Sequence, residues 1–395
     1  MKITDVKCAI LGQYPVVRIC TDAGIDGYAQ AEPKTYLKPH VLFYRDMILG
    51  ADPTDVERVL MRIRRLGAHK PWGSAVSMIE MALWDIAGKA AGVPVYKLLG
   101  GKVRDRVRVY NGAVRFPLAG DTPADYAANM ARMKAAPERF PIIKQGIAFH
   151  SRMPTAVPDF MYGDLQPGGF HANRAPLTEK GLKHVIACIA AMKEVLGDEV
   201  GLALDCGPGW MVADALRLAR AVEPLHVAWL EDLITGDYTP YVLADLYRDL
   251  SSRTTTPIHT GEQIYLRQNF IDLIEKRAVD VIGPDPGDIG GIAELKWVAE
   301  FADLHGILIA PHGTGDGVLG LAALVQVCAT LPPNYLAFEY PVARPAWWYE
   351  IVTGLPDPIV EDGHVAVWDR PGMGVEFVPE AARPYLNPED AGFFD

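Results

Sequence analysis

The sequence predicts an α/β protein: a (β/α)8-type barrel of parallel strands preceded by a smaller α+β domain. Two observations predict this class. From about residue 106, eight short apolar runs alternate with seven helical patterns, as strands and helices do in such a barrel. Several of these runs end in a charged residue, as expected where buried parallel strands reach the mouth of a barrel. A chain of 395 residues is long enough for one large domain and a smaller one.

The smaller domain is expected over residues 1–105. Residues 1–32 contain strand-like runs separated by Ala-Gly and Asp-Gly turns, which predicts a meander of antiparallel strands. Residues 53–66 predict an amphipathic helix, with Asp55 near its start and arginines in its last turn, as the helix dipole favours. Residues 74–91 predict a longer helix that ends before a Gly-Val-Pro segment.

The barrel is expected over residues 106–345. Its strands are predicted at residues 107–111, 141–145, 201–205, 227–231, 257–261, 280–285, 307–311 and 336–340. Its helices are predicted at residues 123–136, 178–196, 212–222, 240–250, 267–277, 292–305 and 316–329. An open doubly wound sheet is the alternative, but it requires a glycine-rich phosphate loop that YNGAVRFPLAGD does not supply. Residues 346–395 include a hairpin-like pattern and are expected to return to the N-terminal domain.

The composition excludes several classes of protein. Half of the residues are apolar and 22% are charged, as in an ordinary soluble protein. A net charge of −11 argues against nucleic-acid binding, and no basic run indicates an anionic membrane partner. The sequence has no signal-peptide pattern and no apolar run of roughly 18 residues that would span a membrane. Five scattered cysteines without a C-x-x-C pair indicate free thiols, so a reducing, cytoplasmic location is expected.

Three successive apolar runs of the barrel end in a carboxylate, namely Asp205, Glu231 and Glu262. Helix capping or a salt bridge explains one such residue, but three at successive strand ends are expected to share one mouth. Carboxylates that share a site repel each other unless a cation neutralises them. Hard oxygen donors without thiolates favour Mg²⁺ over zinc. Asp232 directly follows Glu231 and is the alternative ligand.

The next two apolar runs end in a second pair of functional groups, Asp285 and His312. A carboxylate beside an imidazole fixes its tautomer and raises its basicity, which makes His312 a candidate general base. The proton next to a carboxylate is weakly acidic, and the enediolate formed by its removal needs a divalent cation. A base and a metal in one mouth therefore require each other. Asp288, in the glycine-rich turn past the strand, is the alternative partner of His312.

Four motifs resemble those of the enolase superfamily, in its mandelate racemase-like branch. They are the helix and following residues at 74–101, GPDPGDIGGI at 283–292, APHG at 310–313 and FEYP at 338–341. The resemblance extends over nearly the whole chain. It implies a modified TIM barrel with an N-terminal capping domain, and a symmetric homo-oligomer. It also implies that Mg²⁺ is bound by Asp205, Glu231 and Glu262.

The second predicted strand departs from the pattern of this branch. By resemblance, members that act on both faces of a substrate carry two lysines there as K-x-K, whereas this chain has PIIKQGI with Lys144 alone. Lys144 corresponds to one or the other, so a base role and a role in positioning the substrate carboxylate both stay open. Glu339 ends the eighth strand, where the resemblance implies contact with the substrate carboxylate. A structural salt bridge is the alternative for Glu339.

Residues 147–177 form a long segment rich in Pro, Gly and Met that has no regular period. Loops of this length in a compact domain are usually functional, so a lid over the barrel mouth is one prediction and a surface insertion is the other. His150, Arg152 and His171 in this segment, and Tyr14 near the first turn, are candidates for contacts with a polyol substrate.

The resemblance and the one-sided base pattern together predict a Mg²⁺-dependent dehydratase of an acid sugar, either an aldonate or an aldarate. Such a carbon–oxygen lyase removes the proton next to the carboxylate and expels the β-hydroxyl, giving a 2-keto-3-deoxy acid. Racemisation or epimerisation by His312 and Lys144 from opposite faces is the first alternative. A lactone cycloisomerase and a binding protein that has kept the scaffold without turnover are the others.

Overall fold

The computed structural model describes the chain except for residues 69–71, 113–115, 164–174, 235–242 and 314–316. Its centre is a ring of parallel strands in the order β10-β9-β8-β7-β6-β5-β4-β11. Leu336 N–H donates to Ile309 O at 2.8 Å, which joins the two edges of this sheet. The strands are β4 (Arg106–Gly112), β5 (Ile142–Gly146), β6 (Gly201–Asp205), β7 (Trp229–Glu231), β8 (Ile258–Thr260), β9 (Val281–Ile282), β10 (Leu308–Ile309) and β11 (Phe338–Pro341). The predicted barrel is confirmed, and each predicted strand range contains or overlaps an observed strand.

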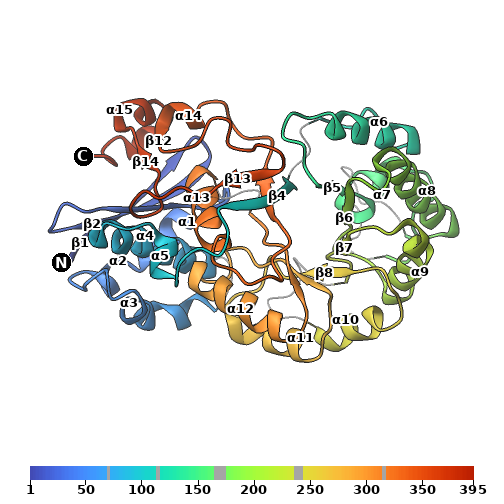
Figure 1. The fold of residues 1–395 in the computed structure, drawn as a ribbon, viewed down its shortest axis with the longest axis horizontal. Coiled ribbons are helices and arrows are strands. Elements are labelled where there is room, and N and C mark those ends of the chain that lie inside the picture. Colours follow the sequence, from blue (N-terminus) through green and yellow to red (C-terminus); the bar gives the residue numbers. More distant parts are fainter. Residues whose placement is uncertain (69–71, 113–115, 164–174, 235–242, 314–316) are drawn as a thin grey trace.

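Helices follow the strands around the outside of the ring, as Figure 1 shows for α6 and for α8 to α12. The helices of the barrel are α6 (Pro123–Lys134), α8 (Glu179–Leu196), α9 (Val212–Val222), α10 (Ala244–Ser251), α11 (Ile271–Glu275), α12 (Ile292–Leu304) and α13 (Gly317–Cys328). Thr122 and Asp125 form a capping box at the start of α6. The helix predicted at 267–277 is shorter than expected. Leu266 has a φ of +65°, and Arg267 N–H donates to the Glu294 side chain instead of continuing a helical ladder.

Apolar side chains fill the interior of the barrel below its mouth. This cluster consists of Tyr110, Ile142, Ala203, Trp229, Val281, Ala310 and Ala337. Tyr110 and Trp229 make an edge-to-face contact with ring centroids 5.2 Å apart. Charged groups directly above this layer therefore lie in a poorly hydrated environment, where their mutual interactions are strong.

The N-terminal domain is a three-stranded antiparallel meander packed against helices, and the predicted meander is confirmed. Its elements are β1 (Ile3–Leu11), β2 (Tyr14–Thr21), β3 (Gly27–Gln30), α1 (Leu37–Phe43), α2 (Arg45–Ile48), α3 (Val56–Ile63), α4 (Trp72–Ala91) and α5 (Val95–Leu98). The helix predicted at 53–66 is the shorter α3, followed by a 3-10 turn over Arg64–Gly67. The Asp55 side chain does not cap α3 and pairs instead with Arg58 at 3.1 Å.

Two helices occupy the contact between this domain and the barrel. Most residues of α4 are buried, and every residue of α13 is. The Gln30 side chain at the end of β3 accepts a hydrogen bond from Leu319 N–H in the first turn of α13, at 3.0 Å. Since the first N–H groups of a helix have no partner within it, a side chain of one domain here completes a helix of the other.

The last residues contact both parts of the molecule. The strand β13 (His364–Ala366) pairs antiparallel with β4 of the barrel. The strands β12 (Val352–Thr353) and β14 (Glu376–Phe377) pair with each other, next to α14 (Trp348–Ile351) and α15 (Pro379–Ala382). The chain then reaches the first sheet, where Ile10 N–H donates to Asp390 at 2.8 Å. The boundaries at 105 and 345 stay predictions.

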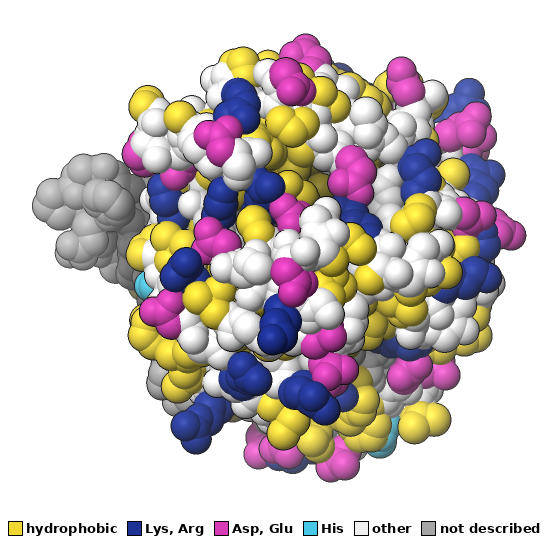
Figure 2. Space-filling model, turned by 90° about the vertical axis from the view of Figure 1, so that its left-hand side faces the viewer, with side chains coloured by type: hydrophobic (Ala, Val, Ile, Leu, Met, Phe, Trp, Pro, Cys, Tyr) yellow, Lys and Arg dark blue, Asp and Glu magenta, His cyan; other side chains and the backbone are white. Residues whose placement is uncertain are grey.

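The surface on the side of the N-terminal domain carries side chains of both charge signs. Figure 2 shows Lys and Arg interspersed with Asp and Glu, with apolar side chains between them. Within the described residues, none of the helices has the length and apolar character needed to cross a membrane.

Candidate active site

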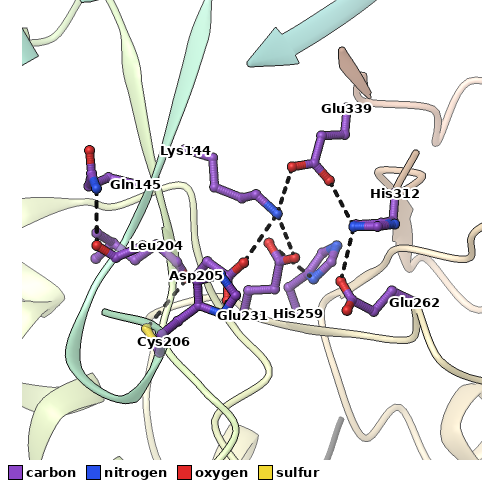
Figure 3. A network of polar contacts seen from close by, with 12 residues as sticks. Lys144, Gln145, Leu204, Asp205, Cys206, Glu231, His259, Glu262, His312 and Glu339 are labelled. Carbon is purple, nitrogen blue, oxygen red and sulfur yellow. Dashed lines mark hydrogen bonds and ion pairs between the residues drawn. The ribbon is translucent and has the colours of Figure 1, made fainter. Parts of the chain in front are cut away.

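A pocket of about 650 Å³ opens at the C-terminal ends of the barrel strands. Residues from several separate strands and connections line it, as expected for the mouth of such a barrel. They are Pro117, Leu118, Asp121, Lys144, Gln145, Gly146, His150, Ser151, Arg152, Asp205, Glu262, His312 and Glu339. In Figure 3 the side chains of Lys144 and His312 enter this space from opposite sides, and carboxylates lie between them.

The strand register brings the predicted acidic residues together. Asp205 and Glu231 are direct neighbours across β6 and β7, so both side chains leave the sheet at the same level. Glu262 follows β8 after Gly261, whose φ of +132° lies in a region that favours glycine. This turn leads the chain over the mouth and places Glu262 on the wall of the pocket.

Lys144 lies among these acids. Its Nζ is 2.9 Å from Glu231 Oε1, 2.9 Å from Glu339 Oε1 and 3.5 Å from Asp205 Oδ2 (Figure 3). The ring of Tyr110 lies below the ammonium, with its centroid at 5.8 Å. Burial by itself would lower the pKa of Lys144, but Glu231 and Glu339 raise it well above its usual value. Lys144 is therefore a fixed positive charge in this arrangement.

The two strand-end acids respond to this lysine in opposite ways. Burial by itself would raise the pKa of Glu231, but the ammonium of Lys144 lowers it to about 2. Burial raises the pKa of Asp205 to about 7, because the more distant Lys144 compensates less and Glu231 adds a like charge. Trp229 Nε1–H also donates to Glu231 Oε2 at 2.8 Å, which fixes the orientation of this carboxylate.

Asp285 and His312 form a hydrogen-bonded pair. His312 Nδ1 lies 2.5 Å from Asp285 Oδ2, so the Nε2 atom is the ring nitrogen that faces the pocket carboxylates. It lies 3.5 Å from both Glu262 Oε2 and Glu339 Oε2. Burial acts to lower the pKa of His312, but the surrounding carboxylates raise it well above its usual value.

The sequence left two choices open, Glu231 or Asp232 as a metal ligand and Asp285 or Asp288 as the partner of His312. The structure distinguishes the members of each pair. Asp232 accepts a hydrogen bond from the Thr260 hydroxyl at 2.5 Å, and its φ of +50° marks the end of the strand. Asp288 is bonded to the Ser74 hydroxyl of the N-terminal domain. Glu231 is therefore the residue that meets Lys144, and Asp285 is the one that meets His312.

The remaining predicted contacts divide between pocket and core. His150 lines the pocket, and its Nδ1 lies 3.2 Å from Asp205 Oδ1. Arg152 lines it too and pairs with Asp121 at 3.1 Å. Tyr14 does not belong to the pocket lining that the structure describes; it is buried and packs edge-on against Trp347 and Trp348. His171, with residues 164–174 of the expected lid, lies outside the described residues.

The donor set suits a hard cation. Asp205, Glu231 and Glu262 offer carboxylate oxygens, and the ammonium of Lys144 shows that a positive charge is accommodated between two of them. Among the described residues, however, the group whose potential ligand atoms lie within 4.8 Å of one another consists of Glu32, Asp285 and His312. Asp205 and Glu231 lie on either side of Lys144, and Glu262 lies beside His312 instead, so the three are not gathered that closely.

Known families match most of the chain. Residues 5–100 match the mandelate racemase / muconate lactonizing enzyme N-terminal domain, and residues 163–381 match the enolase C-terminal domain-like family. The chain belongs to the mandelate racemase/muconate lactonizing enzyme family. The enolase-superfamily resemblance based on four motifs is thereby confirmed, and so is the expected capping domain.

Relatives of this family member match it from end to end. It is 31% identical to the D-xylonate dehydratase of Haloferax volcanii, over 98% of this chain and 89% of the relative. It is 28% identical to a D-galactonate dehydratase of Variovorax paradoxus, over 99% of this chain and 96% of the relative. Among solved structures, a mandelate racemase/muconate lactonizing enzyme-like protein from Rubrobacter xylanophilus has a TM-score of 0.82 and 31% identity, with 98% of both chains covered.

Two residues near the site, Glu32 and Asn111, were not predicted from the sequence patterns. Glu32 follows β3 of the capping domain and reaches the pair formed by Asp285 and His312. The rule applied to the barrel, that functional groups follow strand ends, would have found it if extended to the first sheet. Asn111 on β4 accepts from Lys144 N–H at 2.7 Å and donates to Lys144 O at 2.9 Å. The signal in the sequence is a single amide side chain in the strand-like run VRVYNG, and the sequence patterns assigned no function to it.

Proposed function

We propose that this chain is a Mg²⁺-dependent dehydratase of an acid sugar, an aldonate or an aldarate. The observation that carries the proposal is that His312, paired with Asp285 at 2.5 Å, lines a pocket together with Lys144, Asp205, Glu262 and Glu339. The relatives named D-xylonate and D-galactonate dehydratase, which match this chain along its length, support the same reaction class.

His312 is the proposed general base. Asp285 accepts the hydrogen on Nδ1, so the lone pair of the neutral ring lies on Nε2, which faces the pocket. Nε2 takes the proton from the carbon next to the substrate carboxylate. The electron pair of that C–H bond moves toward the carboxylate, where Lys144 lies on the opposite side of the pocket (Figure 3).

The same imidazole is the proposed acid in the second half of the reaction. The electron pair returns, the C–O bond of the β-hydroxyl breaks, and the proton on Nε2 leaves with that oxygen as water. The resulting enol tautomerises to a 2-keto-3-deoxy acid, so one acid sugar gives one keto acid and one water. One residue is then sufficient for both proton transfers.

Asp205, Glu231 and Glu262 are the residues that would bind Mg²⁺. When bound, the ion supplies positive charge that offsets the carboxylates near His312 and stabilises the anion formed from the substrate. Glu339 and Lys144 face the space where the substrate carboxylate would lie, and we assign both to orienting it. The cytoplasmic location and the homo-oligomer stay predictions.

Epimerisation is the alternative that Lys144 decides. A two-base epimerase needs Lys144 as the second base, on the side of the pocket opposite His312, whereas a one-base dehydration uses His312 for both proton transfers. The variant Lys144→Ala separates the two reactions. It should abolish exchange at the second face, while a one-base dehydration retains measurable turnover.

A panel of aldonates and aldarates tests the proposal. Each compound is incubated with the enzyme and Mg²⁺, and the keto acid is detected with semicarbazide. We expect product from at least one compound, its loss with a chelator, and its return when Mg²⁺ is restored. Deuterium exchange from solvent without any keto acid would overturn dehydration and support epimerisation.

A further inference from the structure

One face of α4 carries three buried polar side chains. Ser74, Ser77 and Glu80 follow one another at three-residue spacing, which places them on one side of the helix. Ser74 is 2% exposed, and Ser77 and Glu80 are 0% exposed. Most of the other buried residues of α4 are apolar, so these three groups require hydrogen-bond partners across the domain boundary.

All three find those partners in the segment that follows β9. The hydroxyl of Ser74 donates to the carboxylate of Asp288. The hydroxyl of Ser77 accepts a hydrogen bond from Gly290 N–H at 2.9 Å and donates to the carbonyl of Gly73 in its own helix, also at 2.9 Å. Two consecutive turns of α4 are thereby bonded to one connecting segment of the barrel.

Glu80 extends this contact to the start of α12. Its carboxylate accepts hydrogen bonds from Ile292 N–H at 2.9 Å and Ala293 N–H at 3.0 Å. These are among the first N–H groups of the helix, which have no partner within it. A Cβ at Gly291 would lie 1.9 Å from Glu80 Oε2, so the missing side chain there permits this approach.

The same segment begins with Asp285. Gly287 N–H donates to Asp285 Oδ1 at 2.6 Å, and His312 binds the other oxygen. Ile289 N–H donates to the Asp285 carbonyl at 2.8 Å. β9 has only two residues, so the barrel sheet itself holds little of this segment. The bonds from α4 hold it from one side, and Leu266 N–H, in the connection after β8, donates to Ile289 O at 2.9 Å.

We propose that Ser77 and Glu80 of the capping domain are positioning residues, which hold the segment after β9 so that Asp285 orients His312 for proton transfer. The kinetic part of this inference rests on the proposed function. Its geometric part does not, because the hydrogen bond between Asp285 and His312 is observable without turnover.

Variants of α4 test the inference. Ser77→Ala removes the acceptor of Gly290 N–H with a small change in side-chain volume, and Glu80→Leu removes the acceptor of both α12 N–H groups. The matched control is Asp85→Leu on the same helix. Asp85 is 1% exposed and accepts from Tyr28 N–H at 3.1 Å and Met373 N–H at 2.8 Å, away from the segment after β9.

The first measurement compares kcat with KM for the full-length enzyme with Mg²⁺. We expect kcat to fall about tenfold in Ser77→Ala and about 100-fold in Glu80→Leu, since small displacements of a catalytic group cost that much. KM should stay nearly constant, because the pocket residues are unchanged. Glu80→Gln keeps an acceptor oxygen and should recover part of kcat. Asp85→Leu should lower thermal stability as Glu80→Leu does, with kcat retained.

The second measurement needs no substrate. A proton shared by His312 Nδ1 and Asp285 gives a downfield proton resonance, assigned by its loss in His312→Asn. We expect this resonance to shift or broaden in Ser77→Ala and Glu80→Leu and to stay in Asp85→Leu. Unchanged resonance and kcat in both Ser77→Ala and Glu80→Leu, or equal losses in Asp85→Leu, would overturn the inference. If the enzyme dehydrates no acid sugar, the proposed function fails while the resonance still decides the positioning role.

Discussion

The two sides of the barrel mouth are positioned in different ways. Lys144, Asp205 and Glu231 lie on β5, β6 and β7, which pair in continuous register. Asp285 and His312 follow β9 and β10, which have two residues each. A paired strand directs its side chains by itself, whereas a connecting segment takes its shape from contacts outside the sheet. The proposed metal side therefore depends on the barrel, and the base side depends on both domains.

The largest effect is expected on the base side, from His312→Asn. Asparagine cannot accept the proton, so turnover of a responsive acid sugar should fall about 1000-fold. Steady-state kinetics measure this, with circular dichroism to show that the fold is retained. Turnover within about tenfold of the parent enzyme would mean that another group on this side is the base.

A smaller effect is expected on the strand side, from Lys144→Met. Without the ammonium, the carboxylates of Glu231 and Glu339 stay buried without their cation, so the metal-free protein should lose about 3 kcal/mol of unfolding free energy. Urea denaturation measures the loss, and added Mg²⁺ should restore part of it. Lys180→Met is the control. Its pairing with Asp159 is exposed, so less than about 1 kcal/mol is expected.

Equal destabilisation by the two lysine variants would contradict the difference between the sides of the mouth. It would mean that the strand pairing and the packing of Tyr110 and Trp229 below the mouth hold Glu231 and Glu339 in place without Lys144. If Lys144→Met loses more unfolding free energy than Lys180→Met and added Mg²⁺ restores none of it, Lys144 has no role beside the ion.

The smallest effect is expected from Tyr14→Phe, which lies on neither side of the mouth. Its ring packs against Trp347 and Trp348, and the pocket lining of the described residues does not include it, so kcat and KM should change less than about twofold. Kinetics on the same substrate measure this. A rise in KM alone would show that the capping-domain hairpin reaches the substrate.

Strand ends were predictable because apolar runs of four to eight residues mark buried parallel strands, and the residue after each run faces the mouth. This rule identified Asp205, Glu262 and His312 as pocket residues, and the structure places all three there. It did not distinguish Glu231 from Asp232, because both directly follow one run. The turn at Asp232, with its φ of +50°, directs this side chain to Thr260 instead.

The sequence by itself determined the order of strands and helices, the family, and the strand ends at which the functional groups lie, because periodicity and short motifs are local properties of a chain. Only the tertiary structure decided that Asp285 rather than Asp288 meets His312, that Glu32 reaches this pair, and that Lys144 lies among the acids. These arrangements are contacts between residues far apart in the chain, as is that between Ser77 and Gly290, which are 213 residues apart. Hydrophobic periodicity carries no information about pairings at such separations.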